Sequence, residues 1–428
     1  MVLDANGTDA DVTVQAAITS GSGGAVTITA DDSVSFTSNG DITSSGSGTV
    51  SVTSNTNTSD GNSGDGITMA NGTLFDAGSG TIVLQATGGN GGSIAIGGLK
   101  TTNANATSSV SISTVAAVTD AGDTDVDVIS GGRLVISSAT GAGSGDSLET
   151  TIVSLNALNS TSGSIQIAES TGLTIFKAEQ SAGAGNVQIV TTDGTITVDN
   201  GGAATNAVIT KSTGTITLNA NGSDKDLLIN DGITSVSGAI DLDADDDIIF
   251  EAPGDITSTS GNVSVTADSD NSPDGTGGAL TMVDQTVINA GTGTITLEAD
   301  EDIKLGRLVT TSSSTVAVTI TTVSGGVIDN GDTGSEDIDA TNGRVVIDAK
   351  NGVGSTVGVG DSDLETDAGS LDIDNTTTGD IKIDETDEVT VIQLDNDKTS
   401  DSNAATGVIV LVAGGAITVA NSAVADWE

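Results

Sequence analysis

The chain has 428 residues with 59 acidic and 11 basic side chains, so its formal net charge is −48. Histidine, cysteine and tyrosine are absent, which excludes imidazole and thiolate metal sites, disulfide bonds, and catalysis by cysteine or by a Ser-His-Asp triad. A charge of this sign and size also argues against binding to nucleic-acid phosphates or to anionic lipid.

The apolar residues are almost all Val, Ile, Leu and Ala, because the chain has only 4 Phe and 1 Trp. Regularly spaced β-branched residues and only 2 Pro favour repetitive β structure over disorder. No apolar run approaches the ~18–20 residues that span a bilayer, so we expect no membrane insertion. The first residues, MVLDANGTDADV, lack the basic and apolar regions of a signal peptide. A secreted form of this chain would therefore be a fragment or a mature segment.

A short phrase recurs along the chain, in which a small residue precedes alternating apolar and polar residues, as in GTITLN and GNVSVT. Its copies open at Val26, Val50, Ile82, Val110, Leu134, Ile165, Val187, Ile216, Ile240, Val263, Ile295, Val318, Val345, Ile381 and Val408. The alternation predicts strands with one buried face, and the Gly, Asn, Asp, Ser and Thr between them predict turns. Such a coil cannot bury its apolar face alone, so the pattern predicts a β-solenoid. We expect roughly 15–18 parallel coils, which at ~4.8 Å each give a rod of about 70–90 Å.

A longer repeat lies over the short one. AVTITADDSVSF (25–36) matches AIDLDADDDIIF (239–250), and SLET (147–150) matches DLET (363–366). We therefore divide the chain into an entry coil (1–17), a first repeat unit (18–231) and a truncated second unit (232–428). Expected inward positions stay apolar between the units, whereas outward ones change, as from Thr27 to Asp241. The two units therefore share the packing of their inward residues rather than a fixed outer surface.

The SLET and DLET segments interrupt the simple alternation. LETTIVSLNAL (148–158) could form a short helix, but LETDAGSLDID (364–374) does not continue that pattern. We predict a strand or a turn within the coil for both segments.

Phrases such as GDITSTSGNVSVTAD (254–268) and GTGTITLEADEDIKLG (291–306) resemble the repeat region of filamentous-haemagglutinin-type bacterial surface adhesins. The resemblance implies a right-handed parallel β-helix that serves as the stalk of a secreted, cell-surface protein. The resemblance covers nearly the whole chain and rests on the general pattern of the repeats rather than on an invariant motif. The NPNG- and NPNL-type motifs of that family's secretion domain do not occur here.

Asp241, Asp243, Asp245 and Asp247, together with Asp246, form the densest acidic cluster. Alternation places the first three on one outer face, ~6–7 Å apart, and stacked coils could bring further carboxylates to ~4.8 Å. Repulsion of this kind is relieved by a hard cation such as Ca²⁺. The alternative is a solvated acidic surface that keeps strand edges from associating. Smaller acidic pairs are Asp268/Asp270, Asp300/Asp302, Asp361/Asp363 and Asp372/Asp374, and GGNGGSIAI (88–96) only approaches a calcium-binding nonapeptide.

Two other functions are less favoured. Thr-x-Thr pairs such as Thr27/Thr29 and Thr294/Thr296 could form an ice-binding face, but threonine also simply suits exposed strand positions. A polysaccharide-active β-helix enzyme would use paired carboxylates. Sugar-binding sites usually contain aromatic side chains, but the chain has a single Trp, Trp427, and no Tyr. Arg133 and Arg344 occupy equivalent places in the two units, which suggests a structural role in the repeat.

The sequence therefore predicts a non-catalytic, extracellular β-solenoid that acts as a rigid stalk or filament element in bacterial surface adhesion or extracellular assembly. A calcium-binding adhesive module is the principal alternative. Head-to-tail self-association through terminal coils is expected as well, because uncapped strand edges can pair with another copy. The surface ligand stays unidentified.

Overall fold

The structure of the protein is a computed structural model that describes residues 1–55, 65–88, 92–122, 125–268, 277–330, 336–354, 363–396 and 407–420. These residues form an all-β solenoid of parallel strands with about 16 coils, and they contain no helix. The described residues accordingly include no helix long and apolar enough to cross a membrane. The predicted fold class is confirmed.

The chain divides into two compact units, Met1–Leu218 and Asn219–Glu428. The first contains strands β1 (Val2–Ala5), β2 (Val12–Val14), β3 (Ile18–Ser20), β4 (Val26–Ala30), β5 (Val34–Phe36), β6 (Ile42–Ser44), β7 (Val50–Thr53), β8 (Ile67–Met69), β9 (Leu74–Asp76), β10 (Ile82–Ala86), β11 (Ile94–Ile96), β12 (Gly98–Thr101), β13 (Val110–Thr114), β14 (Val118–Asp120), β15 (Val128–Ser130), β16 (Arg133–Ser138), β17 (Leu148–Thr151), β18 (Ser154–Asn159), β19 (Ile165–Glu169), β20 (Leu173–Gln180), β21 (Val187–Thr191), β22 (Ile196–Val198) and β23 (Val208–Thr210). Strand β24 (Ile216–Ala220) contains the division.

The second unit contains β25 (Leu227–Ile229), β26 (Ile233–Ser235), β27 (Ile240–Ala244), β28 (Ile248–Phe250), β29 (Ile256–Ser258), β30 (Val263–Ala267), β31 (Leu280–Met282), β32 (Val287–Asn289), β33 (Ile295–Ala299), β34 (Ile303–Leu305), β35 (Arg307–Val309), β36 (Val318–Thr322), β37 (Val327–Asp329), β38 (Ile338–Ala349), β39 (Leu364–Asn375), β40 (Ile381–Glu385), β41 (Val389–Asp395), β42 (Ile409–Ala413) and β43 (Ile417–Val419). The division at 218/219 reflects packing. The predicted boundary at 231/232 reflects the period of the sequence.

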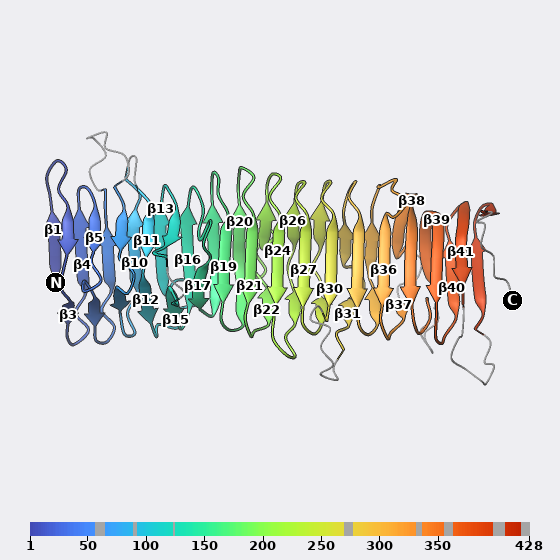
Figure 1. Ribbon diagram of the computed structural model, residues 1–428, viewed down its shortest axis with the longest axis horizontal. Helices are drawn as coiled ribbons and strands as arrows, with labels where there is room; N and C mark the ends of the chain where they lie inside the picture. Colours follow the sequence, from blue (N-terminus) through green and yellow to red (C-terminus); the bar gives the residue numbers. More distant parts are fainter. Residues whose placement is uncertain are drawn as a thin grey trace. The chain divides into compact units, whose positions relative to one another are not determined.

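A typical coil has three short strands, each paired in parallel with the equivalent strand of the next coil. In the first unit, β4, β5 and β6 of one coil pair with β7, β8 and β9 of the next. In the second unit, β27, β28 and β29 pair in the same way with β30, β31 and β32. Figure 1 shows the resulting rows of parallel arrows within each unit. The predicted entry coil belongs to this arrangement, because β1 and β2 pair with β4 and β5.

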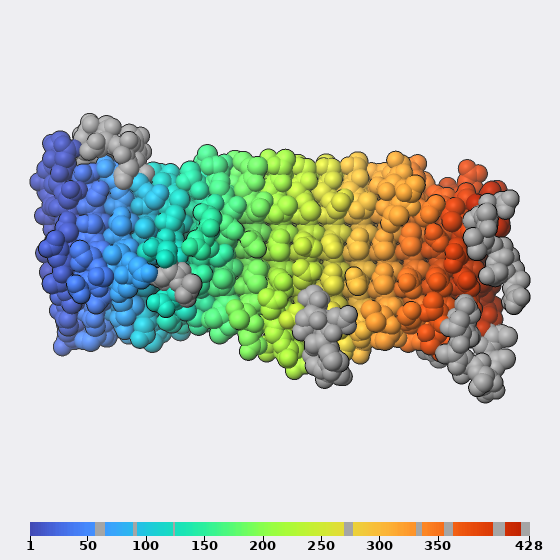
Figure 2. All heavy atoms as spheres, in the orientation of Figure 1, coloured from blue at the N-terminus to red at the C-terminus, as the bar shows by residue number. Residues whose placement is uncertain are grey.

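The core of both units is a stack of aliphatic side chains. Strands β4 and β27 alternate between buried and partly exposed residues, and the predicted inward residues Val26, Ile28, Ile240 and Leu242 are all buried. The Phe36 and Phe75 rings meet edge to face, with centroids 4.7 Å apart. In the second unit, yellow to orange in Figure 2, atoms of neighbouring coils form regular rows.

The recurring phrases do not all lie on one face. Val26, Val50, Ile82, Val110 and Leu134 stack in register as predicted. The next residue of that ladder, however, is Leu155 in β18. Ile165 belongs to another ladder, between Ala142 and Val187. The phrase therefore moves to a different face, because β17 and β18 take the places in the coil that β15 and β16 occupy before them.

The second unit repeats this irregularity. Leu371 of β39 stacks on Val345, while Ile381 of β40 stacks on Val353. The partner of Ile381 in the following coil is Ile409, one residue after the predicted Val408. The SLET and DLET segments are thus strands in the same coil position of the two units. The strand-or-turn prediction for these segments is confirmed as strand.

Candidate metal centres

The predicted cation ligands Asp241 and Asp243 lie on the outer face of β27, and Asp245 and Asp247 lie in the turn that follows. Burial raises the pKa of Asp243 to about 6, and the charges of Asp241 and Asp245 act in the same direction. The next coil places Ser264 beside Asp241 and Thr266 beside Asp243. Hydroxyl groups, rather than further carboxylates, therefore neighbour the two aspartates on that side.

Two of the four predicted ligands accept backbone hydrogen bonds. Asp245 Oδ2 accepts from the Gly222 amide at 2.7 Å, and Asp247 Oδ1 accepts from the Ala279 amide at 2.8 Å. Among the described residues, the sets of three carboxylates with oxygens within 4.8 Å of one another consist of other residues. A cation at the four predicted aspartates stays a prediction.

The hydrogen bond of Asp247 is one case of a recurring arrangement. An Asp or Asn directly before a strand accepts the amide of the residue that faces it in the next coil. Such bonds join Asp11 to Ser33, Asp41 to Leu74, Asp127 to Glu149, Asn186 to Thr215, Asp255 to Val287, Asn262 to Thr294, Asp302 to Gly326, Asp337 to Glu365 and Asp380 to Val408, at 2.9–3.0 Å except for 2.8 Å at Gly326. Many acidic residues thus connect coils. The sequence signal is an Asp or Asn immediately before an apolar strand residue.

One of these connecting aspartates belongs to a cluster of three carboxyl groups in the second unit. Asp329 ends β37, Asp337 directly precedes β38, and Glu365 is the second residue of β39. One carboxylate oxygen from each lies within 4.8 Å of the others. Asp329 is 2% exposed and Asp337 is 1% exposed, so two of the three carboxyl groups are removed from water.

The same three carboxyl groups recur in the first unit. Asp120 ends β14, Asp127 directly precedes β15, and Glu149 is the second residue of β17. Asp127 is 1% exposed. The Glu149 amide donates to Asp127 Oδ2 at 2.9 Å, and in the second unit the Glu365 amide donates to Asp337 Oδ2 at 3.0 Å. The duplication has therefore preserved both the carboxyl groups and the backbone that holds them.

These carboxyl groups are poorly placed to be ionised together. Burial raises the pKa of Asp127 to about 9, and the charges of Asp120 and Glu149 act in the same direction. Burial, followed by the charge of Asp329, likewise raises the pKa of Asp337. Asp127 Oδ1, Asp337 Oδ1 and Glu149 Oε2 are buried without a hydrogen-bond donor among the described residues. Each group of buried carboxyls is therefore stabilised by a proton or by a cation that offsets its charge.

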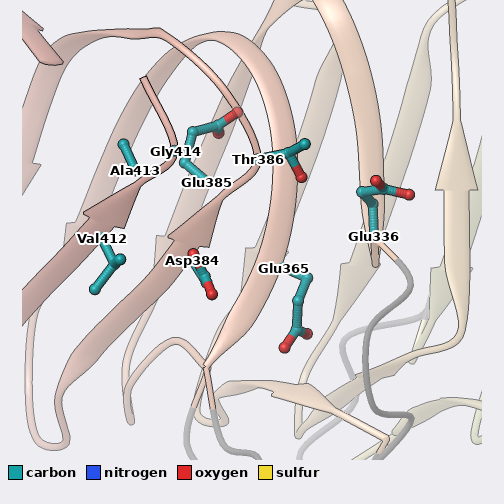
Figure 3. A pocket seen from close by; sticks show the side chains of 8 residues that line it. All are labelled: Glu336, Glu365, Asp384, Glu385, Thr386, Val412, Ala413 and Gly414. Atoms are coloured by element: carbon teal, nitrogen blue, oxygen red, sulfur yellow. The ribbon is translucent and has the colours of Figure 1, made fainter. Parts of the chain in front are cut away.

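A surface cavity adjoins the cluster of the second unit. The cavity has a volume of about 310 Å³, and its lining includes Glu336, Glu365, Asp384 and Glu385. Glu365 and Asp384 face each other across neighbouring strands, and Figure 3 shows their carboxylates on the same side of the ribbon. Glu365 thus belongs both to the buried cluster and to the wall of an acidic opening.

A second set of three carboxyl groups, Asp367, Glu385 and Asp387, also lies within 4.8 Å in the second unit. The Thr366 hydroxyl and the Ala368 amide donate to the buried Glu385 carboxylate at 2.7 and 3.0 Å. At the equivalent place in the first unit, Glu169 accepts from Thr150 at 2.7 Å and from the hydroxyl of Thr171 at 2.8 Å. Both glutamates are thus held by hydrogen-bond donors, but the first unit has Thr151 and Thr171 in place of Asp367 and Asp387, so this set of three carboxyl groups does not recur there.

The remaining predicted features have other surroundings. The Arg133 guanidinium lies 3.7 Å from the centre of the Phe176 ring, whereas Arg344 Nη1 pairs with Asp372 at 3.4 Å. Thr296 stacks between Ser264 and Thr319, so the threonine rows are mixed with serine. Asp270, Asp361, Trp427 and residues 89–91 of the nonapeptide-like segment lie outside the described residues.

Comparison with known proteins adds no relative: no family model, curated protein or solved structure matches this chain. The resemblance to filamentous-haemagglutinin-type repeats therefore stays an expectation from the sequence.

Proposed function

We propose that this chain is a structural, non-catalytic β-solenoid segment that acts as a rigid stalk or filament element in bacterial surface adhesion or extracellular assembly. The observation that carries the proposal is the difference between the inside and the outside of the repeated coils. Inward positions stay apolar and buried in both units, as at Val26 and Ile240, whereas the outward Thr27 is replaced by Asp241. A protein selected for its shape needs constant packing but no fixed outer chemistry.

The backbone arrangement supports stiffness within each unit. Parallel strands connect consecutive coils on three faces, and Asp or Asn side chains add further bonds between coils, as from Asp302 to Gly326. Bending such a coil stack would break several of these bonds together. The carboxylate-rich exterior would keep the protein soluble and discourage lateral pairing.

Head-to-tail association through terminal coils belongs to the same proposal. Among the last described strands, Ile417 is 47% exposed and Val419 is 66% exposed. Apolar side chains of this kind could be covered by a coil of another copy. Analytical ultracentrifugation over a wide concentration range would detect this association.

The test of the structural role is a binding and stiffness experiment on the full chain. The protein would be applied in solution to glycan arrays and to immobilised extracellular-matrix proteins. The rate of its digestion by a broad-specificity protease would report on its rigidity. We expect slow digestion and no saturable binding. Saturable binding of one ligand, lost on changing outward residues of a single face, would instead make the chain a binding module.

A further inference from the structure

We propose that the chain binds two calcium ions at duplicated internal sites, one held by Asp329, Asp337 and Glu365, the other by Asp120, Asp127 and Glu149. These are not the aspartates on β27 that the sequence pattern suggests. The inference does not depend on the structural role proposed above.

The distances in the second unit suit a hard divalent cation. Two ligands at about 2.3–2.6 Å from a calcium ion lie at most about 5.2 Å apart. The three carboxylate oxygens of Asp329, Asp337 and Glu365 lie within 4.8 Å of one another, so one ion can contact all three. Calcium accepts six to eight oxygen ligands in a flexible geometry, which leaves positions for backbone carbonyl groups and water.

A second observation is independent of the clustering. Asp127 and Asp337 are each 1% exposed, and the Oδ1 atom of each is buried without a hydrogen-bond donor. The other oxygen of each side chain, Oδ2, is already engaged by the amide of the next coil. An aspartate held from one side, with its second oxygen buried and unsatisfied, needs a positive partner on that side.

The duplication gives a third argument. Acidic residues at some other places change between the units, since Asp367 and Asp387 correspond to Thr151 and Thr171. By contrast, all three carboxyl groups of the proposed site occur in both units, at the same strand ends. Packing does not explain this, because the repulsion among buried carboxylates opposes folding. A ligand that requires the charges does explain it.

The two sites are not equal. The described carboxyl groups within 4.8 Å of one another include the three of the second unit but not those of the first. Glu365 also lines the acidic cavity of about 310 Å³, so one of the three carboxyl groups lies at an opening to solvent. We therefore expect the second-unit site to bind calcium more tightly than the first-unit site.

The experiment is calcium titration of the full chain by isothermal calorimetry after treatment with a chelator. The wild-type chain should bind two ions, and Asp337→Asn or Asp127→Asn should each remove one. The double variant should bind none. Asparagine retains an oxygen for the backbone amide and removes the charge, so the variants are expected to fold. Glu365→Gln and Glu149→Gln provide a second pair that leaves the connecting aspartates intact.

The matched control is Asp255→Asn. Asp255 Oδ1 accepts the Val287 amide at 2.9 Å in the same way, but it does not belong to either site. This control, and Asp243→Asn on the outer face, should still bind two ions.

Thermal unfolding supplies an independent readout. Millimolar calcium should raise the melting temperature of the wild-type chain by several degrees and leave that of the double variant unchanged. The proposal is overturned if the wild-type chain binds no calcium, which would mean that protons neutralise the carboxyl groups. Unchanged stoichiometry in the double variant, or loss of an ion in Asp243→Asn alone, would overturn it as well.

Discussion

At the scale of single residues, the acidic side chains of this protein do different things although they look alike in sequence. Asp241 lies on an outer face, Asp302 connects two coils, and Asp337 connects coils while also lying in a buried cluster. The difference depends on where each residue lies relative to a strand. An Asp directly before a strand accepts an amide of the next coil, Asp241 at a middle position of its strand faces outward, and Asp329 at the end of β37 is buried.

We predict that Asp302→Ala lowers the free energy of unfolding by about 1 kcal/mol, because the Gly326 amide loses its acceptor. Asp302→Asn retains an oxygen at that place and should cost clearly less. Denaturant unfolding of both variants measures the difference. Equal losses would show that charge, and not the hydrogen bond, is what Asp302 contributes.

Glu179 gives a prediction about pH. Burial disfavours its charge, but hydrogen bonds from Lys211, Ser181 and Lys177 outweigh burial and lower its pKa to about 2. Its folded pKa is below its unfolded value, so it stabilises the protein above about pH 4.5 and loses that effect as the pH falls toward 2. Glu179→Gln should therefore destabilise the chain at neutral pH.

The difference in stability between the wild-type chain and Glu179→Gln should become progressively smaller as the pH falls toward 2. Denaturant unfolding of wild type and Glu179→Gln at neutral pH and near pH 2 to 3 provides the check. A difference in stability that persists unchanged near pH 2 would show that Glu179 acts through packing rather than through its charge.

At the scale of strands, the contribution of a residue depends on which face of the coil it occupies. In β13, Ile112 is fully buried, whereas its neighbour Ser111 is partly exposed. Each inward residue also lies between equivalent residues of two other coils, as Ile112 does between Leu84 and Ile136. A cavity at one position would therefore affect three coils.

We predict that Ile112→Ala costs about 2–5 kcal/mol of unfolding free energy, the range for truncating a buried aliphatic side chain. Ser111→Ala in the same strand should change stability by less than about 0.5 kcal/mol. Both are measured by denaturant unfolding. A large effect of Ser111→Ala would indicate that the outer face has a structural role of its own.

At the scale of the whole chain, the dominant quantity is the net charge of −48. Repulsion among so many carboxylates opposes folding, and dissolved salt at 0.1 M ionic strength largely screens the repulsion between exposed charges more than about 10 Å apart. We predict that sodium chloride raises the melting temperature progressively from low to physiological ionic strength. The measurement requires a chelator throughout, so that traces of divalent cation do not contribute. A melting temperature independent of salt would mean that the charges are already neutralised in pairs.

Much of the architecture could be predicted because it is periodic in sequence. Alternation in AVTITADDSVSF gives strands and their buried residues, and the second unit repeats the pattern at 239–250. What periodicity could not give was the shift to another face at Ile165. That shift occurs because β17 stacks on β15 and β18 stacks on β16. Which strand stacks on which is decided by pairing between segments that are distant in sequence.

The sequence by itself determined the class of the protein: a repetitive, aliphatic, strongly acidic β structure with inward and outward residues assigned by alternation. Only the tertiary structure decided which of its many carboxyl groups come together. Asp329, Asp337 and Glu365 are separated along the chain and meet because consecutive coils stack in register. Asp241 and Asp243 are close in sequence, but the strand spreads them along an open face. Which residues of neighbouring coils lie close together depends on the register of strand pairing, and a local sequence pattern does not reveal that register.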